Sequence, residues 1–257
     1  MLQISKENPY LLILWLVKYS RLEKKNVADS LIRKIRETQT PIFKHFKNNM
    51  HNKYNTLNIV DKNYLNNNLI IKFLLKNFLN KNSKSLKKIN AYKLKGLDVG
   101  CGEAHLLSFL FKNNVLNKIT ALDINYEKLI YAKNNYSYFD YIQSDIHNLP
   151  FNENSFDYVI ANEVLEHIRA PYKAMLEFKR ISKKDGWILI SVPHEPFFCL
   201  GNILRGKYLK NGGKTPSHMN FWRKKEFEEF IDEFVIIKNK YWISVFPWLL
   251  YLGKVKK

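Results

Sequence analysis

The stretch LKGLDVGCGEAHLLSFL at residues 94–110 decides the fold, because it carries a buried strand through a glycine turn into a helix. LKGLDV is a short apolar run typical of a strand, and AHLLSFLFKNN has helical spacing. The turn consists of Gly100, Cys101 and Gly102, and Asp98 stands two residues before it. A carboxylate beside apolar packing is costly unless a positive group compensates it, so the sequence predicts a cation next to Asp98.

Strands and helices alternate outward from this stretch. The expected strands are KITALDI, DYIQSD, FDYVIAN and WILISV, and the expected helices are NYEKLIYAKNN, APYKAMLEFKRIS and KKEFEEFIDEF. Asn125 is the expected N-cap of the first helix, Pro171 suits the first turn of the second, and Asp185 with Gly186 is expected to end that helix. The alternation predicts an α/β fold with a doubly wound, mostly parallel sheet. VIIKNKYWISV and PWLLYLGK are expected to add an antiparallel pair at its edge.

The chain is expected to divide into a basic helical extension at residues 1–60 and a domain at residues 61–257. The extension contains no β-patterned run. The first clear helix has an apolar face of Leu69, Ile70, Phe73, Leu74, Asn77 and Phe78, and the Asn-, Ser- and Lys-rich residues 80–90 after it are expected to be a linker. Residues 194–222 hold four glycines and two prolines, which predicts a substrate-side insertion at the ligand-facing end of the sheet.

Charge is unevenly distributed along the 257 residues. The net charge is +19, and residues 1–95 carry 20 Lys and Arg against five Asp and Glu. This asymmetry fits an anionic partner, namely a phospholipid surface, nucleic acid or an anionic substrate. Lys, Asn and Ile are abundant throughout the chain, so compositional drift is favoured as the main cause of the charge.

The apolar run at residues 11–17 is too short to span a membrane, since a spanning helix needs about 18–20 residues. Packing on the domain is favoured over an interfacial helix on a membrane surface. One of the two cysteines, Cys101, lies in the glycine turn, which disfavours a disulfide framework with Cys199. The expected compartment is therefore the cytoplasm, with peripheral contact at the inner face of the membrane as the alternative. No Cys/His spacing typical of zinc sites occurs in the sequence.

A glycine turn between a strand and a helix most often cradles a nucleotide. A nicotinamide-dinucleotide fingerprint would need its final small residue one place later, and its pyrophosphate would lie beside the Asp98 carboxylate. A P-loop is excluded because no Gly-Lys-Ser/Thr follows. S-adenosylmethionine fits better, because it has no phosphate and its ammonium group would pair with Asp98. Gly100 and Gly102 would let the backbone approach it closely.

Two further acids end the next two strands. Asp123 lies 25 residues after Asp98, where a carboxylate can accept from both ribose hydroxyls. Asp145 follows the third strand in QSDIHNLPF, where it can accept from the adenine amino group. Three acids at three successive strand ends, together with the glycine turn, favour a cofactor site over acids that merely cap turns.

LDVGCGEAHLL, ALDIN, SDIHNLPFNENSFDYVIANEVLEHI and GWILISVP together resemble the class I S-adenosylmethionine-dependent methyltransferases, in the small-molecule branch that includes ubiquinone- and menaquinone-pathway enzymes. The resemblance covers residues 94–195 and implies a seven-stranded Rossmann-like sheet with an antiparallel last strand. It implies methyl transfer to a small-molecule, lipid or glycan-precursor acceptor. The implied cofactor-binding residues are Asp98, Gly100, Cys101, Gly102, Asp123, Ile124, Asp145, Ile146 and Asn162. The family often has glycine where Ala104 stands, which is a mild change if that position is helical.

Candidates for a general base follow the fourth and fifth strands. Glu163, Glu166 and His167 would share one face of a helix. The resemblance to ubiquinone O-methyltransferases implies a divalent metal on these three, but a loop-positioning role for LEHI is favoured over His167 as base and over a metal. His194 directly follows SVP and is expected to touch substrate or act as base, and His218 is a weaker candidate. The catalytic candidates are therefore His167, His194 and Glu163, and no metal is expected.

A nucleic-acid methyltransferase and a non-catalytic cofactor-binding domain are the competing functions. Amino-methylating DNA enzymes of this fold typically have an Asn/Asp/Ser-Pro-Pro-Tyr/Phe tetrad after the fourth strand, where this chain has ANEV. Neither cysteine is placed as a cytosine nucleophile, and the complete set of motifs argues against a non-catalytic domain. A small-molecule or lipid- or glycan-linked substrate is thus favoured over nucleic acid, and the sequence leaves the oligomeric state open.

Overall fold

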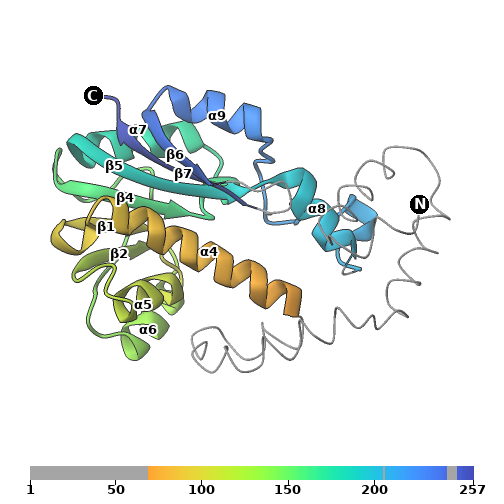
Figure 1. The fold of residues 1–257 in the computed structure, drawn as a ribbon, viewed down its shortest axis with the longest axis horizontal. Coiled ribbons are helices and arrows are strands. Elements are labelled where there is room, and N and C mark those ends of the chain that lie inside the picture. The colour runs from red at the N-terminus through yellow and green to blue at the C-terminus, as the bar shows by residue number, and fades with distance from the viewer. Residues whose placement is uncertain (1–68, 205, 242–247) are drawn as a thin grey trace. The chain divides into compact units, whose positions relative to one another are not determined.

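The computed structural model describes residues 69–204, 206–241 and 248–257, which form a seven-stranded sheet with helices on both faces (Figure 1). The strands are β1 (Gly96–Val99), β2 (Ile119–Asp123), β3 (Asp140–Gln143), β4 (Phe156–Asn162), β5 (Ser182–Pro193), β6 (Val235–Tyr241) and β7 (Trp248–Val255). The helices are α4 (Leu69–Lys88), α5 (His105–Lys112), α6 (Tyr126–Asn135), α7 (Pro171–Ile181), α8 (Glu195–Leu204) and α9 (Lys224–Asp232), with short 3-10 helices η1 (Ala91–Lys93), η2 (Leu165–His167) and η3 (Leu209–Asn211). The predicted α/β class is confirmed.

The strand order is β3-β2-β1-β4-β5-β7-β6, and β7 runs antiparallel to both of its neighbours. The pairs β1–β2, β2–β3, β1–β4 and β4–β5 are parallel, so the carboxyl ends of β1 to β5 lie along one edge of the sheet. The chain order reverses between β1 and β4, which is where such sheets bind ligands. The glycine turn after β1 therefore lies at the predicted binding edge.

Two apolar layers cover the two faces of the sheet. One core cluster combines β-strand side chains with residues of α4, α5 and α6, and the other combines them with residues of α7 and α9 (Figure 1). Alternation along β1 assigns its faces, because Leu97 and Val99 belong to the α7 and α9 side. The side chain of Asp98, between them, therefore points to the α4, α5 and α6 side.

Residues 80–90 are not the linker that their composition indicated, because α4 continues to Lys88. Asn82 and Ser85 are fully buried in this segment, as is Leu86. The Asn82 side chain donates to the Phe78 carbonyl at 3.0 Å and the Ser85 hydroxyl donates to the Lys81 carbonyl at 2.8 Å, so their polar groups are satisfied within the helix. Small polar residues that bond back to the preceding turn can continue a buried helical face.

The boundaries of α7 also differ from the expectation at one end. Pro171 occupies the first turn as predicted, but the helix ends at Ile181 and Asp185 and Gly186 lie within β5. A Cβ at Gly186 would approach the Lys183 carbonyl oxygen at 2.8 Å, so this position requires glycine for close backbone packing within the strand.

The extension expected at residues 1–60, with its apolar run at residues 11–17, lies outside the described residues, as does the start of the domain expected at residues 61–257. The insertion expected at residues 194–222 carries α8 and η3. Within residues 69–257, apart from 205 and 242–247, no helix combines the length and the apolar character that a bilayer crossing requires.

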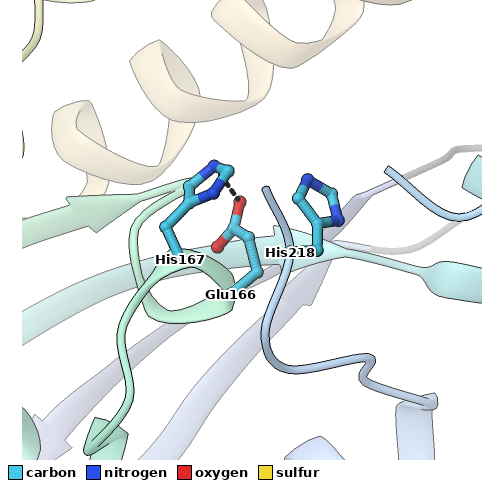
Figure 2. Close-up of side chains that lie close together, drawn as sticks. All are labelled: Glu166, His167 and His218. Carbon is cyan, nitrogen blue, oxygen red and sulfur yellow. Dashed lines mark ion pairs between the residues drawn. The ribbon is translucent and has the colours of Figure 1, made fainter. Parts of the chain in front are cut away.

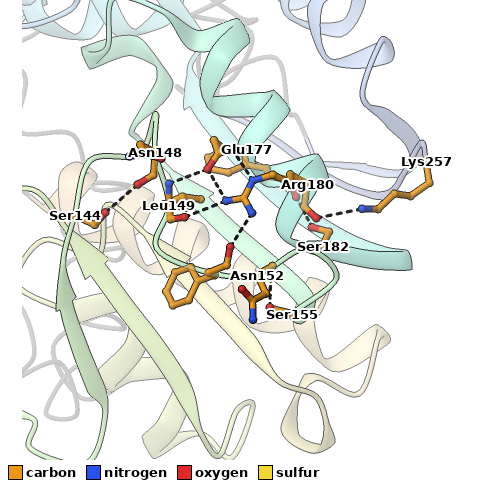
Figure 3. Close-up of polar contacts among 11 residues, drawn as sticks. Ser144, Asn148, Leu149, Asn152, Ser155, Glu177, Arg180, Ser182 and Lys257 are labelled. Atoms are coloured by element: carbon orange, nitrogen blue, oxygen red, sulfur yellow. Dashed lines mark hydrogen bonds and ion pairs between the residues drawn. The ribbon is translucent and has the colours of Figure 1, made fainter.

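Arg180 of α7 ties the loop between β3 and β4 to that helix (Figure 3). Its guanidinium donates to both carboxylate oxygens of Glu177 at 2.7 and 2.8 Å, and to the carbonyl oxygens of Phe151 and Leu149 at 2.7 and 3.0 Å. Glu177 in turn accepts from the Leu149 amide at 2.8 Å. These bonds fix residues 149–151 of the loop that also contains Asp145.

We expect Arg180→Ala to lower the free energy of unfolding by about 2 kcal/mol, because two partly buried carbonyls would lose their side-chain donor and the Glu177 carboxylate would keep only the Leu149 amide. Urea denaturation measures this change. Lys173→Ala, at an exposed position of the same helix, is the matched control and should change stability by less than about 0.5 kcal/mol. Equal effects of the two substitutions would show that the Arg180 contacts do not stabilise the loop.

Candidate cofactor and catalytic site

The turn after β1 leaves an open stretch of backbone at the binding edge. Gly100 has φ 74°, and a Cβ there would lie 2.4 Å from a Val164 methyl group, so glycine is required at this position. Gly102 has φ 55°, and a Cβ there would meet no atom of the protein within 4 Å. The amides of Gly100 and Cys101 both donate to the Leu122 carbonyl, which ties the turn to β2. A ligand can therefore approach the backbone at Gly102.

Asp98 is a buried carboxylate that the protein leaves unpaired. Its exposed fraction is 4%, and its side chain has no hydrogen-bond or ion-pair partner among the described residues. Burial, followed by the neighbouring Asp123 carboxylate, raises the pKa of Asp98 to about 8. Such a group is stabilised strongly by any cation that reaches it.

Asp123 stands at the end of β2 and holds the glycine turn. One carboxylate oxygen accepts from the Gly102 amide at 2.8 Å, and the other accepts from the Asn125 amide at 2.8 Å. Each oxygen retains a second acceptor site, because a carboxylate has about four lone-pair positions. Asn125 is the N-cap of α6, as predicted, and its side chain accepts from the Lys128 amide at 3.0 Å.

The remaining predicted cofactor residues at the ends of β2 and β3 are Ile124, Asp145 and Ile146, and they differ in exposure and bonding. One oxygen of Asp145 accepts from the His147 backbone amide at 2.9 Å and from the His147 ring at 2.8 Å, and the backbone bond is the main reason that its pKa is lowered. Ile124 is 67% exposed beside Asp123, whereas Ile146 is buried in the core at 8%. Ile124 therefore offers an open apolar surface, and Ile146 packs against the protein itself.

Ala104 adopts a left-handed conformation with φ 58° at the N-terminus of α5, so this position is not helical. Alanine in place of the family's glycine is therefore a less mild change than the sequence indicated, because a residue with a Cβ disfavours positive φ.

The Cys101 thiol donates to the Gly102 carbonyl, and burial raises its pKa. The thiol is therefore protonated and is a poor nucleophile.

Asn162 at the end of β4 contacts α4. The sequence did not predict this contact, because residues 80–90 were expected to be a linker. Its side-chain amide donates to the Asn82 side-chain oxygen at 2.8 Å. Its own side-chain oxygen is buried and accepts no hydrogen bond from the described part of the chain. Asn82 lies four residues after Phe78 and three before Ser85, which continues the apolar face of the helix, and this spacing would have been the signal for its burial.

Glu163 is held by two partners that the sequence did not reveal. Its oxygens accept from the Ser191 hydroxyl at 3.1 Å and from the Trp248 indole at 2.6 Å, and its backbone has φ 56°. Burial raises its pKa to about 8 against the opposing effect of these two hydrogen bonds. Both oxygens are occupied, which favours a positioning role for Glu163 at the junction of β4, β5 and β7.

The structure brings Glu166 and His167 of η2 together with His218 of the insertion, and Glu163 is not a member of this group (Figure 2). One donor atom from each of the three side chains lies within 4.8 Å of the others. His167 is exposed on one side, and the partial burial of its ring lowers its pKa. The contact between the insertion and η2 could not be inferred from sequence spacing. His167 bonds with the Ser217 carbonyl, and the two residues are 50 positions apart.

His194 follows the carboxyl end of β5, as predicted. It is 9% exposed, its ring centroid lies 4.8 Å from that of Phe197, and no described residue forms a hydrogen bond with its ring. Burial lowers its pKa and the Lys224 charge lowers it further, against the opposing effect of Glu195. The imidazole is therefore neutral near pH 7 and can accept a proton.

The contribution of Asp98 and Glu163 to the free energy of unfolding should fall between about pH 4 and pH 8. Asp98 and Glu163 both have folded-state pKa values of about 8, above their unfolded values, so the folded chain binds more protons than the unfolded chain across this window. We expect the double variant Asp98→Asn, Glu163→Gln to be more stable than the parent at pH 8 by more than about 2 kcal/mol, and by much less at pH 4. Urea denaturation of the ligand-free proteins at both pH values measures this. A difference that does not depend on pH would contradict the raised pKa values.

Comparisons with known proteins agree with the fold and the motifs. Residues 97–190 match a family model described as a methyltransferase domain. Over 95 residues the chain is 30% identical to the malonyl-[acyl-carrier protein] O-methyltransferase of Pectobacterium atrosepticum, and the alignment covers 37% of each protein. Over 91 residues it is 32% identical to the demethylmenaquinone methyltransferase of Renibacterium salmoninarum, which covers 35% of this chain and 38% of the relative. The chain thus spans less than half the length of these curated relatives.

The YcgJ protein of Bacillus subtilis has a similar fold, with a TM-score of 0.52 at 16% identity, covering 68% of this chain and 99% of that one. A likeness at this identity concerns the fold alone. The β3-β2-β1-β4-β5-β7-β6 order, the glycine turn after β1 and the family match agree with one another. Residues 97–190 therefore resemble a methyltransferase domain of the class I S-adenosylmethionine-dependent type, and the matched relatives are themselves named as methyltransferases.

Proposed function

We propose that the chain transfers the methyl group of S-adenosylmethionine to a small-molecule, lipid-linked or glycan-precursor acceptor by in-line displacement. The observation that carries this proposal is the Asp98 carboxylate, which is 4% exposed, unpaired within the described residues and next to the open turn at Gly102. A buried carboxylate without a partner is unfavourable in the empty protein and favourable once an ammonium group pairs with it.

The residues around Asp98 fit the remaining parts of this cofactor. Asp123 keeps lone pairs for the ribose hydroxyls while it accepts from the Gly102 and Asn125 amides. Ile124 offers an exposed apolar side chain to the adenine, and the second oxygen of Asp145 is free of the His147 contacts. A dinucleotide fits worse, because its pyrophosphate would face the negative edge formed by these acids.

The cofactor supplies the methyl electrophile when it is bound, and the protein supplies alignment and a dry environment. Alignment of the two reactants can lower the barrier by about 7–11 kcal/mol. Asp98, Asp123 and the Gly100–Gly102 turn fix the donor side of this arrangement in our proposal. The acceptor is expected on the side of the insertion at residues 194–222, which follows the carboxyl end of β5.

Among the three catalytic candidates, we favour His194 as the group that accepts a proton from the acceptor. Its ring is free of hydrogen bonds to the described residues, and its lowered pKa keeps it neutral. Glu163 already accepts from Ser191 and Trp248, and His167 already donates to the Ser217 carbonyl at 3.0 Å. A positioned base of this kind contributes about 10²- to 10⁴-fold to the rate.

The names of the relatives support a small acceptor. One is named for a malonyl group on acyl-carrier protein and the other for demethylmenaquinone. A lipid-linked acceptor would also agree with the excess of Lys and Arg in residues 1–95, which favours contact with an anionic membrane surface. Nucleic acid shares that electrostatic preference, so it is an outcome to be tested rather than a second proposal.

The experiment has two steps. Calorimetry should detect binding of S-adenosylmethionine and S-adenosylhomocysteine but not of NAD. The protein is then incubated with methyl-tritiated S-adenosylmethionine and three acceptor pools from bacterial cells, namely small metabolites, lipids presented in anionic vesicles, and total nucleic acid. Label in either of the first two pools is the expected result. Label in nucleic acid alone, or binding of the cofactor with no label in any pool, would overturn the proposal.

A further inference from the structure

The insertion and η2 together form a cluster of donor atoms that methyl transfer does not require. Glu166, His167 and His218 each place one ligand-type atom within 4.8 Å of the others (Figure 2). His167 Nε2 lies 3.8 Å from a carboxylate oxygen of Glu166. We infer that these three side chains form a binding site for a divalent transition-metal ion, with Zn²⁺ as the ion whose ligand preferences they match.

The Glu166 carboxylate is the strongest indication of a missing cation. The residue is 0% exposed, and neither carboxylate oxygen has a hydrogen-bond partner within the described chain. Protonation would remove the charge but would leave a buried hydroxyl without an acceptor, which is also unfavourable. A metal ion would compensate the charge and satisfy the oxygens at once.

Both imidazoles already carry the contacts that orient metal-binding histidines. His167 Nδ1 lies 3.0 Å from the Ser217 carbonyl oxygen and His218 Nδ1 lies 2.8 Å from a Glu195 carboxylate oxygen. Because both partners can only accept, Nδ1 is the donor in each ring, and the lone pair remains on Nε2. A carbonyl or carboxylate on the second ring nitrogen is the usual arrangement around a bound metal. Glu195 is itself held by the Cys199 thiol at 3.2 Å.

Backbone contacts hold the two halves of the cluster together in the protein as it stands. The amides of Met219 and Asn220 donate to the Glu166 carbonyl at 2.7 and 3.1 Å. The Asn220 side chain donates to the carbonyls of Leu165 and Ile168 at 2.8 and 2.7 Å. The segment that carries His218 is thus fixed on η2 without help from an ion, and the site is preorganised.

Two imidazole nitrogens and one carboxylate oxygen are a common ligand set for zinc, with a fourth position left open. Bonds of about 2.0–2.2 Å would place the donors roughly 3.4 Å apart, so the 3.8 Å gap between His167 and Glu166 closes with a small side-chain rotation. Glu163 does not belong to the set, because Ser191 and Trp248 occupy its oxygens. The site therefore needs His218 from the insertion.

The test is metal binding by the full chain, which is independent of methyl transfer. Protein freed of metal with EDTA is titrated with Zn²⁺ in competition with a chromophoric chelator, and with Co²⁺ while the visible absorption is recorded. We expect about one equivalent and the intense absorption of tetrahedral cobalt. Glu166→Gln and His218→Ala should each weaken binding by more than 100-fold, and Glu195→Gln by about 10- to 100-fold, because Glu195 orients His218 without touching the ion.

His105→Ala is the matched control, since His105 forms another histidine–acid pair, with Glu103 at 2.9 Å. It should leave the stoichiometry and affinity unchanged. Glu166→Gln preserves the shape of the side chain, so the test survives if His218→Ala fails to fold. Absence of Zn²⁺ binding at 100-fold excess over the protein, or tight binding that Glu166→Gln leaves unchanged, overturns the proposal.

Discussion

Replacing Asp98 by asparagine is expected to weaken the binding of S-adenosylhomocysteine about 30- to 1000-fold. Removing one member of a buried charge pair typically costs about 2–4 kcal/mol, because the remaining charge keeps its desolvation penalty. Asparagine has the shape of aspartate but no charge, so the change is confined to electrostatics. Calorimetry with the parent and the variant measures the difference, and circular dichroism checks that the variant is folded.

The matched ligand for this experiment is 5′-methylthioadenosine, which has the adenosine of the cofactor but no ammonium group. Asp98→Asn should change its affinity by less than about threefold, which is the scatter of ordinary contacts. A large loss for both ligands would show that Asp98 supports the turn rather than the ammonium group. Unchanged binding of S-adenosylhomocysteine would show that Asp98 does not pair with the ammonium group.

Asp123→Ala is expected to weaken the binding of adenosine and of S-adenosylhomocysteine alike, by about 10- to 150-fold. Hydrogen bonds from a ligand hydroxyl to a carboxylate contribute about 1.5–3 kcal/mol. The same substitution also frees the amides of Gly102 and Asn125, which now donate to this carboxylate at 2.8 Å each. Fluorescence or calorimetric titration with the two ligands measures the loss.

The control for this substitution is Asp140→Ala, at the opposite end of the strand pair. Asp140 begins β3, is exposed and forms an ion pair with Lys118 at 3.7 Å. Its removal should leave both affinities unchanged. If Asp123→Ala binds adenosine as the parent does, the ribose assignment is wrong, whatever the result at Asp98.

The fold could be predicted from local patterns because its parallel strands are short apolar runs separated by helices with recognisable ends. Asn125 and Pro171 mark helix starts, and the acids at the ends of β1 and β2 follow from the strand register alone. These features depend only on residues near one another in sequence. The carboxyl edge of a parallel sheet then brings them together without further information.

The remaining features depend on contacts between distant segments, which no local pattern encodes. Asn82 accepts a hydrogen bond from the Asn162 side chain, and it lies in a part of α4 whose polar composition indicated a linker. Trp248 holds Glu163 from β7, and His218 reaches η2 from the insertion. In each case a polar side chain is explained by a partner that only the tertiary structure supplies.

The central claim is that the Asp98 carboxylate holds a cationic amino group, and proton release on binding tests it most directly. With a pKa of about 8, Asp98 is almost fully protonated at pH 6.5 in the empty protein, and it must ionise to pair with an ammonium group. Calorimetry of S-adenosylhomocysteine binding at pH 6.5, in buffers of different ionisation enthalpy, should show release of close to one proton by the parent. The Asp98→Asn variant should release none. Binding by the parent without proton release would contradict the account.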